Sequence, residues 1–193
     1  MPLFDHFSLA APWYETFIRP KDPRTLAALI DLRPGGALLD AGGGTGRVAQ
    51  FLGGLAAPLV VADSSCRMLQ EARKKAGLRP VCSAAERLPF PDASFARVMM
   101  VDALHHVRDQ RHTARELWRL LQPGGRLVIE EPDVRTAPVR LLALAERLAL
   151  MRSHFLAPDD ISGLFPYPDA RVRVEAEGHT VWIVVEKVRA PQT

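Results

Sequence analysis

The feature that most constrains the fold is a glycine-rich turn between a short apolar run and a segment of helical periodicity. Residues 37–39 are apolar and lead to Asp40, and residues 42–46 contain four glycines. Glycine has no Cβ and tolerates positive φ, so such a turn can approach a ligand closely. After Arg47, apolar residues recur at helical spacing: Val48, Phe51, Leu52 and Leu55. The order of strand, turn and helix predicts a ligand site at the carboxyl end of a buried parallel strand.

The spacing of the glycines excludes two common phosphate-binding turns. A dinucleotide fingerprint G-x-G-x-x-G that starts at Gly42 would need a glycine where Arg47 stands. A P-loop would need Lys followed by Ser or Thr at the helix start, and residues 46–48 are Gly-Arg-Val. The pattern that remains is D-x-G-x-G-x-G.

That pattern, formed by Asp40, Gly42, Gly44 and Gly46, resembles the first motif of class I S-adenosylmethionine-dependent methyltransferases. The methionyl end of this cofactor is a zwitterion. Backbone N–H groups can therefore face its carboxylate while acidic side chains favour its ammonium. The resemblance implies that Asp40, Ala41 and the three glycines bind the cofactor.

A second acidic residue follows the next predicted strand, residues 58–62. Asp63 stands about 20 residues beyond the glycine turn, where doubly wound sheets place a carboxylate that accepts ribose hydroxyls. Asp63 and Ser64 are therefore expected at the ribose. The alternative for Asp63 is a helix cap, a role that Ser64 or Ser65 could fill instead. Met68 is expected against the adenine, with a place in the core as its alternative.

Residues 85–95 extend the resemblance. They match the family's D-A-E-x-L-P-F-x-D-x-S-F-D stretch, whose first residues contact the adenine amino group. The resemblance implies that Ala85 and Glu86 border the adenine; for Glu86, a solvated loop acid is the alternative. Two acids of the family pattern are replaced here, by Ala84 and Ala96.

Two histidines follow the strand predicted over residues 95–101. That strand ends in Asp102, and His105 and His106 lie in a stretch that resembles the family's x-A-L-H-H-V. Ligands bind at such a strand end, so Asp102 is expected beside the cofactor and the histidines on the methyl side. Either histidine could act as a general base, with a structural or cofactor-shell role as the alternative. No metal ion is expected, because adjacent helical positions point about 100° apart.

The two ends of the chain match the family more loosely. Residues 1–22 resemble the family's leader F-D-x-x-A-x-x-Y-D, which implies a lid over the cofactor with Tyr14 facing the site; an amphipathic segment packed on the core is the alternative. Residues 23–193 are expected to form one domain. His154 is a further candidate base, with an exposed loop histidine as the alternative. Two alternating runs around residues 178–179 predict an antiparallel hairpin.

Composition limits the partners and the compartment. The chain has 193 residues and a net charge of +3 with a small, scattered basic excess, which gives no reason to expect a nucleic acid partner. No apolar run reaches about 18 residues, so stable membrane insertion is not expected. Cys66 and Cys82 show neither a zinc nor a redox spacing, and reduced thiols in a cytoplasmic protein are the expectation.

Together these patterns predict an α/β fold: a doubly wound, seven-stranded, mostly parallel sheet with an antiparallel C-terminal hairpin. The resemblance is to type 11 methyltransferases, nearest to the ubiquinone and menaquinone biosynthesis group. It implies S-adenosyl-L-methionine as cofactor and a small-molecule acceptor, quinone-like or another metabolite; a homodimer is the assembly considered. Two alternatives stay open: a cofactor-binding protein without catalysis, and a nicotinamide-dependent oxidoreductase.

Overall fold

A seven-stranded sheet organises the chain, in the order β3-β2-β1-β4-β5-β7-β6. The computed structural model describes residues 23–32, 35–148 and 153–189, so the predicted lid segment and Tyr14 lie outside the described residues. The strands are β1 (Leu38–Ala41), β2 (Leu59–Asp63), β3 (Leu78–Cys82), β4 (Phe95–Val101), β5 (Leu121–Pro132), β6 (Ala170–Glu177) and β7 (Thr180–Lys187).

Strands β1 to β5 are parallel to their neighbours, and β7 joins β5 in antiparallel register. Strand β6 pairs with β7 through the turn at residues 178–179, and it is largely exposed at the edge of the sheet. The predicted doubly wound sheet with an antiparallel C-terminal hairpin is confirmed. The chain reverses strand order between β1 and β4, so the carboxyl ends of these two strands form the switch point at which such folds bind ligands.

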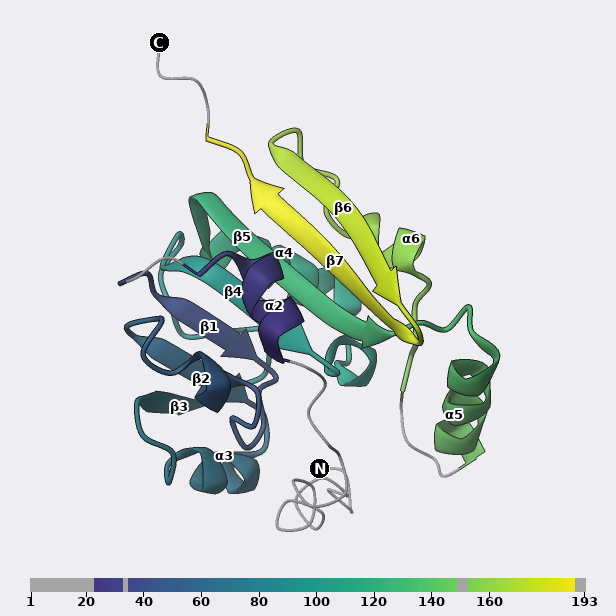
Figure 1. Cartoon of the computed structure of the whole chain (residues 1–193), viewed down its shortest axis with the longest axis horizontal. Helices are drawn as coiled ribbons and strands as arrows, with labels where there is room; N and C mark the ends of the chain where they lie inside the picture. Colours follow the sequence, from purple (N-terminus) through teal and green to yellow (C-terminus); the bar gives the residue numbers. More distant parts are fainter. Residues whose placement is uncertain (1–22, 33–34, 149–152, 190–193) are drawn as a thin grey trace.

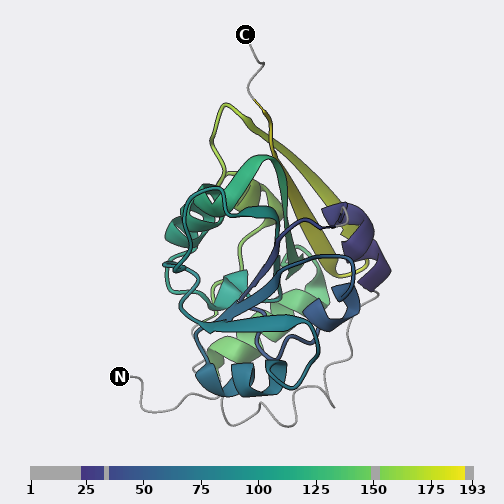
Figure 2. The ribbon, with the colours of Figure 1, turned by 90° about the vertical axis from the view of Figure 1, so that its left-hand side faces the viewer.

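Helices cover both faces of the sheet. They are α2 (Pro23–Ile30), η1 (Ala49–Leu52), α3 (Cys66–Ala72), η2 (Leu104–His106), α4 (Gln110–Leu120), α5 (Ala137–Leu148) and α6 (Pro158–Ser162), where η marks 3₁₀ turns. Figure 2 shows α2 and α4 on opposite sides of the sheet. Helix α5 lies beyond the carboxyl end of β5 (Figure 1). None of the described helices is both long enough and apolar enough to cross a membrane.

The core has two layers because successive residues of a strand face opposite sides of the sheet. Leu39 of β1 packs in the layer under α4 and α6, and Leu38 packs in the layer under α2 and α3. The same alternation continues in β7, where Ile183 joins the first layer and Val184 the second. The central strands β1, β2 and β4 are thus buried on both faces of the sheet. Their parallel direction places their carboxyl ends at one edge.

The helix predicted after the glycine turn is much shorter than expected. Only η1 forms there, and two of the predicted inward residues, Phe51 and Leu55, are 49% and 48% exposed. The segment between Gly46 and Gly53 holds fewer residues than two α-helical turns need, so a full amphipathic helix does not fit.

The two cysteines are joined in a disulfide, so the prediction of reduced thiols is wrong. The parallel register places Cys82 beside Asp63, and Cys66 begins α3 just beyond Asp63. Their Cα atoms are 5.3 Å apart, within the range that a disulfide spans. The pairing depends on strand register, which the spacing of the cysteines in the sequence does not reveal.

Candidate active site

The glycine turn is shaped by positions that exclude a side chain. Gly42, Gly44 and Gly46 all have positive φ, at 74°, 53° and 69°. A Cβ on Gly42 would lie 2.7 Å from the Cβ of Ala103, and one on Gly44 would lie 3.0 Å from Met68 Cε. The turn therefore runs close to the switch-point loop on one side and to α3 on the other.

Asp40 lies buried beneath this turn. Its side chain is 1% exposed, and neither carboxylate oxygen accepts a hydrogen bond from any residue that the structure describes. Burial raises the pKa of Asp40 to about 7; the negative charge of Asp63 adds to the rise and Arg47 opposes it. A Cβ on Gly43 would touch this carboxylate, so the backbone of the turn passes directly over the charge of Asp40.

Asp63 clamps the turn from the neighbouring strand. Its Oδ2 accepts a hydrogen bond from the backbone N–H of Gly44 at 2.9 Å, and its Oδ1 accepts one from Ser65 at 2.7 Å. The capping role belongs to Ser65, whose hydroxyl accepts from the Met68 N–H at 3.4 Å. Ser64, between them, is exposed. Asp40 and Asp63, the two acids predicted to bind one ligand, therefore lie at the same turn.

The residues predicted at the adenine flank the same edge. Met68 is 6% exposed and faces Gly44, which agrees with either of its predicted roles. Ala85 is half-buried against the first core layer. Glu86 accepts a hydrogen bond from the Arg108 backbone N–H at 2.8 Å at the surface, which ties this loop to the segment after η2 and agrees with either of its predicted roles. Contact of Ala85 and Glu86 with adenine stays a prediction.

Arg47 is a site residue that sequence reasoning used only to exclude other motifs. It is 8% exposed, and its guanidinium lies 3.8 Å from the carboxylate of Asp102 at the end of β4. Asp102 has positive φ, at 50°, and its N–H donates to the Glu130 carbonyl at 2.9 Å. The pair connects the glycine turn to the switch-point loop.

Glu131, on β5, holds that loop in place and was missed altogether. Its buried carboxylate accepts hydrogen bonds from the N–H groups of Ala103 at 3.0 Å and Leu104 at 2.8 Å. It also bonds His105 Nδ1 at 2.5 Å. An acidic pair near the end of a buried strand, Glu130–Glu131, was the signal that could have pointed to it.

His105 is built into the protein more firmly than an ordinary loop histidine. It is 5% exposed and its ring stacks on Phe155, with 4.3 Å between centroids. Burial lowers the pKa of His105, but the hydrogen bond and charge of Glu131 outweigh it and the net pKa is raised. Because Glu131 engages Nδ1, Nε2 is the ring nitrogen left for chemistry.

His106 lies against its neighbour instead of pointing away from it. The two ring centroids are 3.9 Å apart, so the predicted divergence of the adjacent side chains is wrong. Turn η2 has only three residues, and no further helical turns hold the two side chains on separate faces. Burial, reinforced by the charge of His105, lowers the pKa of His106 to about 3, which keeps this imidazole neutral at pH 7.

His154 reaches this region through its backbone. Its N–H donates to the His105 carbonyl at 2.7 Å and its carbonyl accepts from Gln110 Nε2 at 2.6 Å, while the side chain is exposed. Of the three candidate bases, the structure brings together the side chains of His105 and His106.

The residues at the glycine turn fit S-adenosylmethionine. A buried carboxylate that accepts no hydrogen bond from the described residues suits a positively charged group above the turn. A side chain at Gly42 would block the approach to the switch-point loop. Met68 supplies an apolar surface at the same place.

Comparison with known proteins agrees with this geometry. A family model described as "Methyltransferase domain" matches residues 39–129. The chain is 36% identical over 118 residues to the ubiquinone/menaquinone biosynthesis C-methyltransferase UbiE of Hahella chejuensis, covering 56% of this chain and 47% of that protein. It is 34% identical over 131 residues to the 27-O-demethylrifamycin SV methyltransferase of Amycolatopsis mediterranei, covering 64% and 48%.

The chain spans about half the length of these curated relatives. Its fold is shared with a solved structure of a methyltransferase from Haloferax volcanii in complex with the activator Trm112, at 17% identity and a TM-score of 0.84 over 97% of this chain and 100% of that one. Residues 39–129 therefore resemble a methyltransferase domain, and over part of its length the chain is similar to ubiquinone and menaquinone biosynthesis C-methyltransferases.

Proposed function

We propose that this protein transfers a methyl group from S-adenosylmethionine to a small-molecule acceptor. One observation carries the proposal: Asp40 and Asp63 lie against successive glycines of a single turn at the switch point. A turn of this shape offers backbone N–H groups and negative charge to one ligand, which suits a zwitterionic amino acid group next to a ribose.

Each side of the turn has a role in holding the cofactor. Asp40 and the glycine backbone select the methionyl end. Asp63 and Ser64 take the ribose, since each Asp63 oxygen that accepts one backbone N–H can accept a further hydrogen bond. Met68, Ala85 and Glu86 border the adenine, Asp102 borders the methyl side, and Tyr14 belongs to the predicted lid.

Methyl transfer requires the protein mainly to position the acceptor against the cofactor. The bound cofactor supplies a methyl group already activated on a sulfonium. The protein's contribution is to align the acceptor in line and to exclude water. Where the acceptor must lose a proton, the loss is handled at the pair His105 and His106, because they are the candidate bases whose side chains lie inward.

The acceptor is proposed to be a small metabolite. The relatives act, by name, in ubiquinone and menaquinone biosynthesis and on 27-O-demethylrifamycin SV, which supports a quinone-like or other small-molecule acceptor. A homodimer and a cytoplasmic location stay predictions. The disulfide counts against the cytoplasm, because the cytosol keeps most thiols reduced.

Two experiments test the proposal. Calorimetry should detect S-adenosylhomocysteine binding and no NAD⁺ binding. Saturation at about 100 times Kd should add about 2.7 kcal/mol to stability, a rise of several degrees in Tm. Transfer of labelled methyl to a panel of hydroxylated quinones and phenols then separates catalysis from binding alone. Binding of NAD⁺ and not of S-adenosylhomocysteine would overturn the proposed methyltransferase function.

A further inference from the structure

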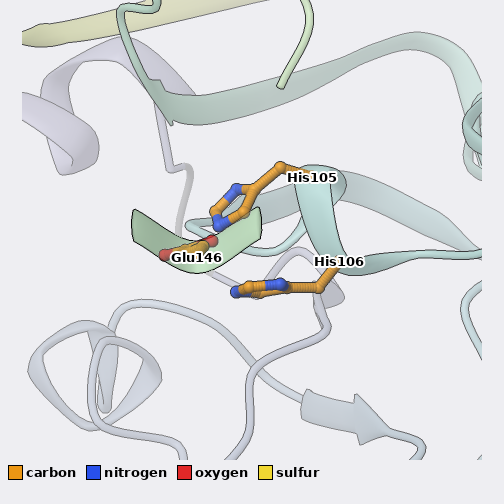
Figure 3. Close-up of side chains that lie close together, drawn as sticks. All are labelled: His105, His106 and Glu146. Atoms are coloured by element: carbon orange, nitrogen blue, oxygen red, sulfur yellow. The ribbon is translucent and has the colours of Figure 1, made fainter. Parts of the chain in front are cut away.

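Three potential metal ligands converge beside the switch point. His105 and His106 of η2 and Glu146 of α5 each offer a ligand atom, and these atoms all lie within 4.8 Å of one another. Figure 3 shows the two rings and the carboxylate gathered together. Glu146 is 40 or more positions away from the histidines along the chain, so tertiary packing creates this cluster.

Both imidazoles are fixed through Nδ1. Glu131 bonds Nδ1 of His105 at 2.5 Å, and the Ser153 hydroxyl lies 3.2 Å from Nδ1 of His106. Metal-binding histidines characteristically use one ring nitrogen for the ion and the other for a carboxylate, carbonyl or similar group that orients the ring. The Glu131–His105 pair has this arrangement.

Glu146 lacks a conventional partner for part of its carboxylate. Its Oε2 is buried and accepts no hydrogen bond within the parts of the chain that the structure describes. A buried carboxylate oxygen without a donor is costly unless a cation lies near it. The ion pair of His105 with Glu131 involves Nδ1, and it leaves Oε2 of Glu146 without a hydrogen bond from the described residues.

We propose that His105, His106 and Glu146 bind one divalent transition-metal ion with the chemistry of Zn²⁺. Two imidazoles and a carboxylate form a set typical of catalytic zinc sites, which keep a further position open. Imidazole ligands disfavour Mg²⁺ and Ca²⁺, which prefer oxygen. Tetrahedral zinc places its ligand atoms roughly 3.4 Å apart, so small side-chain rotations would close the cluster around the ion.

The position of the ion would specify the acceptor, and this step rests on the proposed function. The cluster follows Asp102 closely after β4, at the strand end that the proposed function assigns to the methyl side, so an ion held there would lie near the acceptor. In this arrangement the histidines would hold the ion and would not act as bases themselves, and an acceptor hydroxyl or phenol bound to the ion would lose its proton to water more readily. Its oxygen electron pair then forms the bond to the methyl carbon, and the methyl–sulfur electron pair returns to sulfur. The substrate class is therefore an oxygen acceptor.

The test measures metal binding on the full chain. Tag-free protein is treated with EDTA, dialysed without thiol reductant so that the Cys66–Cys82 disulfide stays closed, and titrated with Zn²⁺ by calorimetry and with Co²⁺ by visible absorption. We expect one ion per chain with tetrahedral Co²⁺ bands, and no binding of Mg²⁺ at the same concentrations.

Variants assign the ligands. Glu146→Gln and His106→Ala should each weaken Zn²⁺ binding by at least about tenfold, because loss of even an outer-shell partner has that effect. His112→Ala, on the exposed surface of α4, is the matched control and should leave Zn²⁺ affinity unchanged. Should His106→Ala fail to fold, Glu146→Gln carries the test alone, since its side chain keeps the same shape.

Absence of Zn²⁺ binding, or affinity that Glu146→Gln leaves unchanged, overturns the inference. S-adenosylhomocysteine affinity is measured on the same samples, because the glycine turn is separate from the cluster. If the chain binds S-adenosylhomocysteine but no zinc, the proposed function stands and the metal site is wrong. If the chain binds zinc but not S-adenosylhomocysteine, the metal site stands and the proposed function is wrong.

Discussion

Two buried carboxylates at the same edge of the sheet are treated in opposite ways. Glu131, at the end of β5, receives three hydrogen bonds from the loop that carries His105. Asp40, on β1, is equally buried, yet neither of its oxygens accepts a hydrogen bond from the described part of the chain, and its pKa is raised to about 7.

The difference separates an acid that organises a loop from an acid whose oxygens accept no hydrogen bond from the described residues. A buried carboxylate whose acceptor sites are filled stabilises the groups that fill them. One without donors costs the fold free energy whenever it ionises. Under the proposed function, a positively charged ligand above the glycine turn would offset that cost at Asp40, whereas the acceptor sites of Glu131 are filled from within the chain.

The largest effect is expected at Glu131. Glu131→Ala leaves the N–H groups of Ala103 and Leu104 and the ring of His105 without their acceptor, and should lower the free energy of unfolding by about 3–5 kcal/mol. Urea denaturation measures the loss. Glu177→Ala, on the exposed edge strand, is the control and should change stability by less than about 0.5 kcal/mol. A similarly small effect at Glu131 would erase the contrast with Asp40.

Asp40→Asn should have the opposite effect on stability. Because the folded-state pKa is raised from 3.8 to about 7, the stability that the protonated carboxyl provides is complete below pH 3.8 and is lost as pH rises through 7. Asparagine stays neutral at every pH. The free energy of unfolding of the variant should therefore exceed that of the wild type by up to about 4 kcal/mol at pH 8 and should equal it near pH 4. S-adenosylhomocysteine affinity should fall about tenfold. A loss of stability at pH 8 would contradict this account.

The third prediction concerns the contribution of the disulfide to stability on the side of the sheet that holds Asp40. Cys66 and Cys82 are 16 positions apart, so opening the bond should cost up to about 3 kcal/mol through the entropy of the unfolded chain. Cys66→Ser/Cys82→Ser, unfolded in urea beside the oxidised wild type, measures this cost. The wild type in dithiothreitol should match the double variant, and a mismatch would assign the effect to the serines.

A smaller effect is expected from pH alone. The ionised form of Asp40 favours the cofactor ammonium, so S-adenosylhomocysteine affinity should rise by up to about tenfold between pH 6 and pH 8. Calorimetry at fixed ionic strength measures the profile, and Asp40→Asn should flatten it. If the pH dependence of the affinity persists in the variant, a group other than Asp40 is responsible for it.

The smallest effect belongs to His154. Its side chain is exposed while its backbone joins His105 and Gln110, so His154→Ala should change stability by less than about 0.5 kcal/mol. His154→Pro would remove the N–H donated to His105 and should be clearly less stable. Equal stability of the two variants would show that the backbone contact is unimportant.

The arrangement at the glycine turn could be predicted from the sequence because its signals are local. Asp40 and the glycines form one short motif, and Asp63 follows at a fixed distance in this fold. The arrangement around η2 could not, because Glu131, Ser153 and Glu146 reach η2 only through tertiary packing. The disulfide was missed for the same reason, since it depends on strand register.

Strand β7 imposes an order on how the protein can be made. It is the last of the seven strands along the chain, yet it lies between β5 and β6 and supplies both core layers. A nascent chain that still lacks residues 180–187 exposes the β5 edge and the apolar surfaces that β7 covers. The glycine turn can form early on the ribosome, but the sheet beside it closes only after Lys187 has emerged.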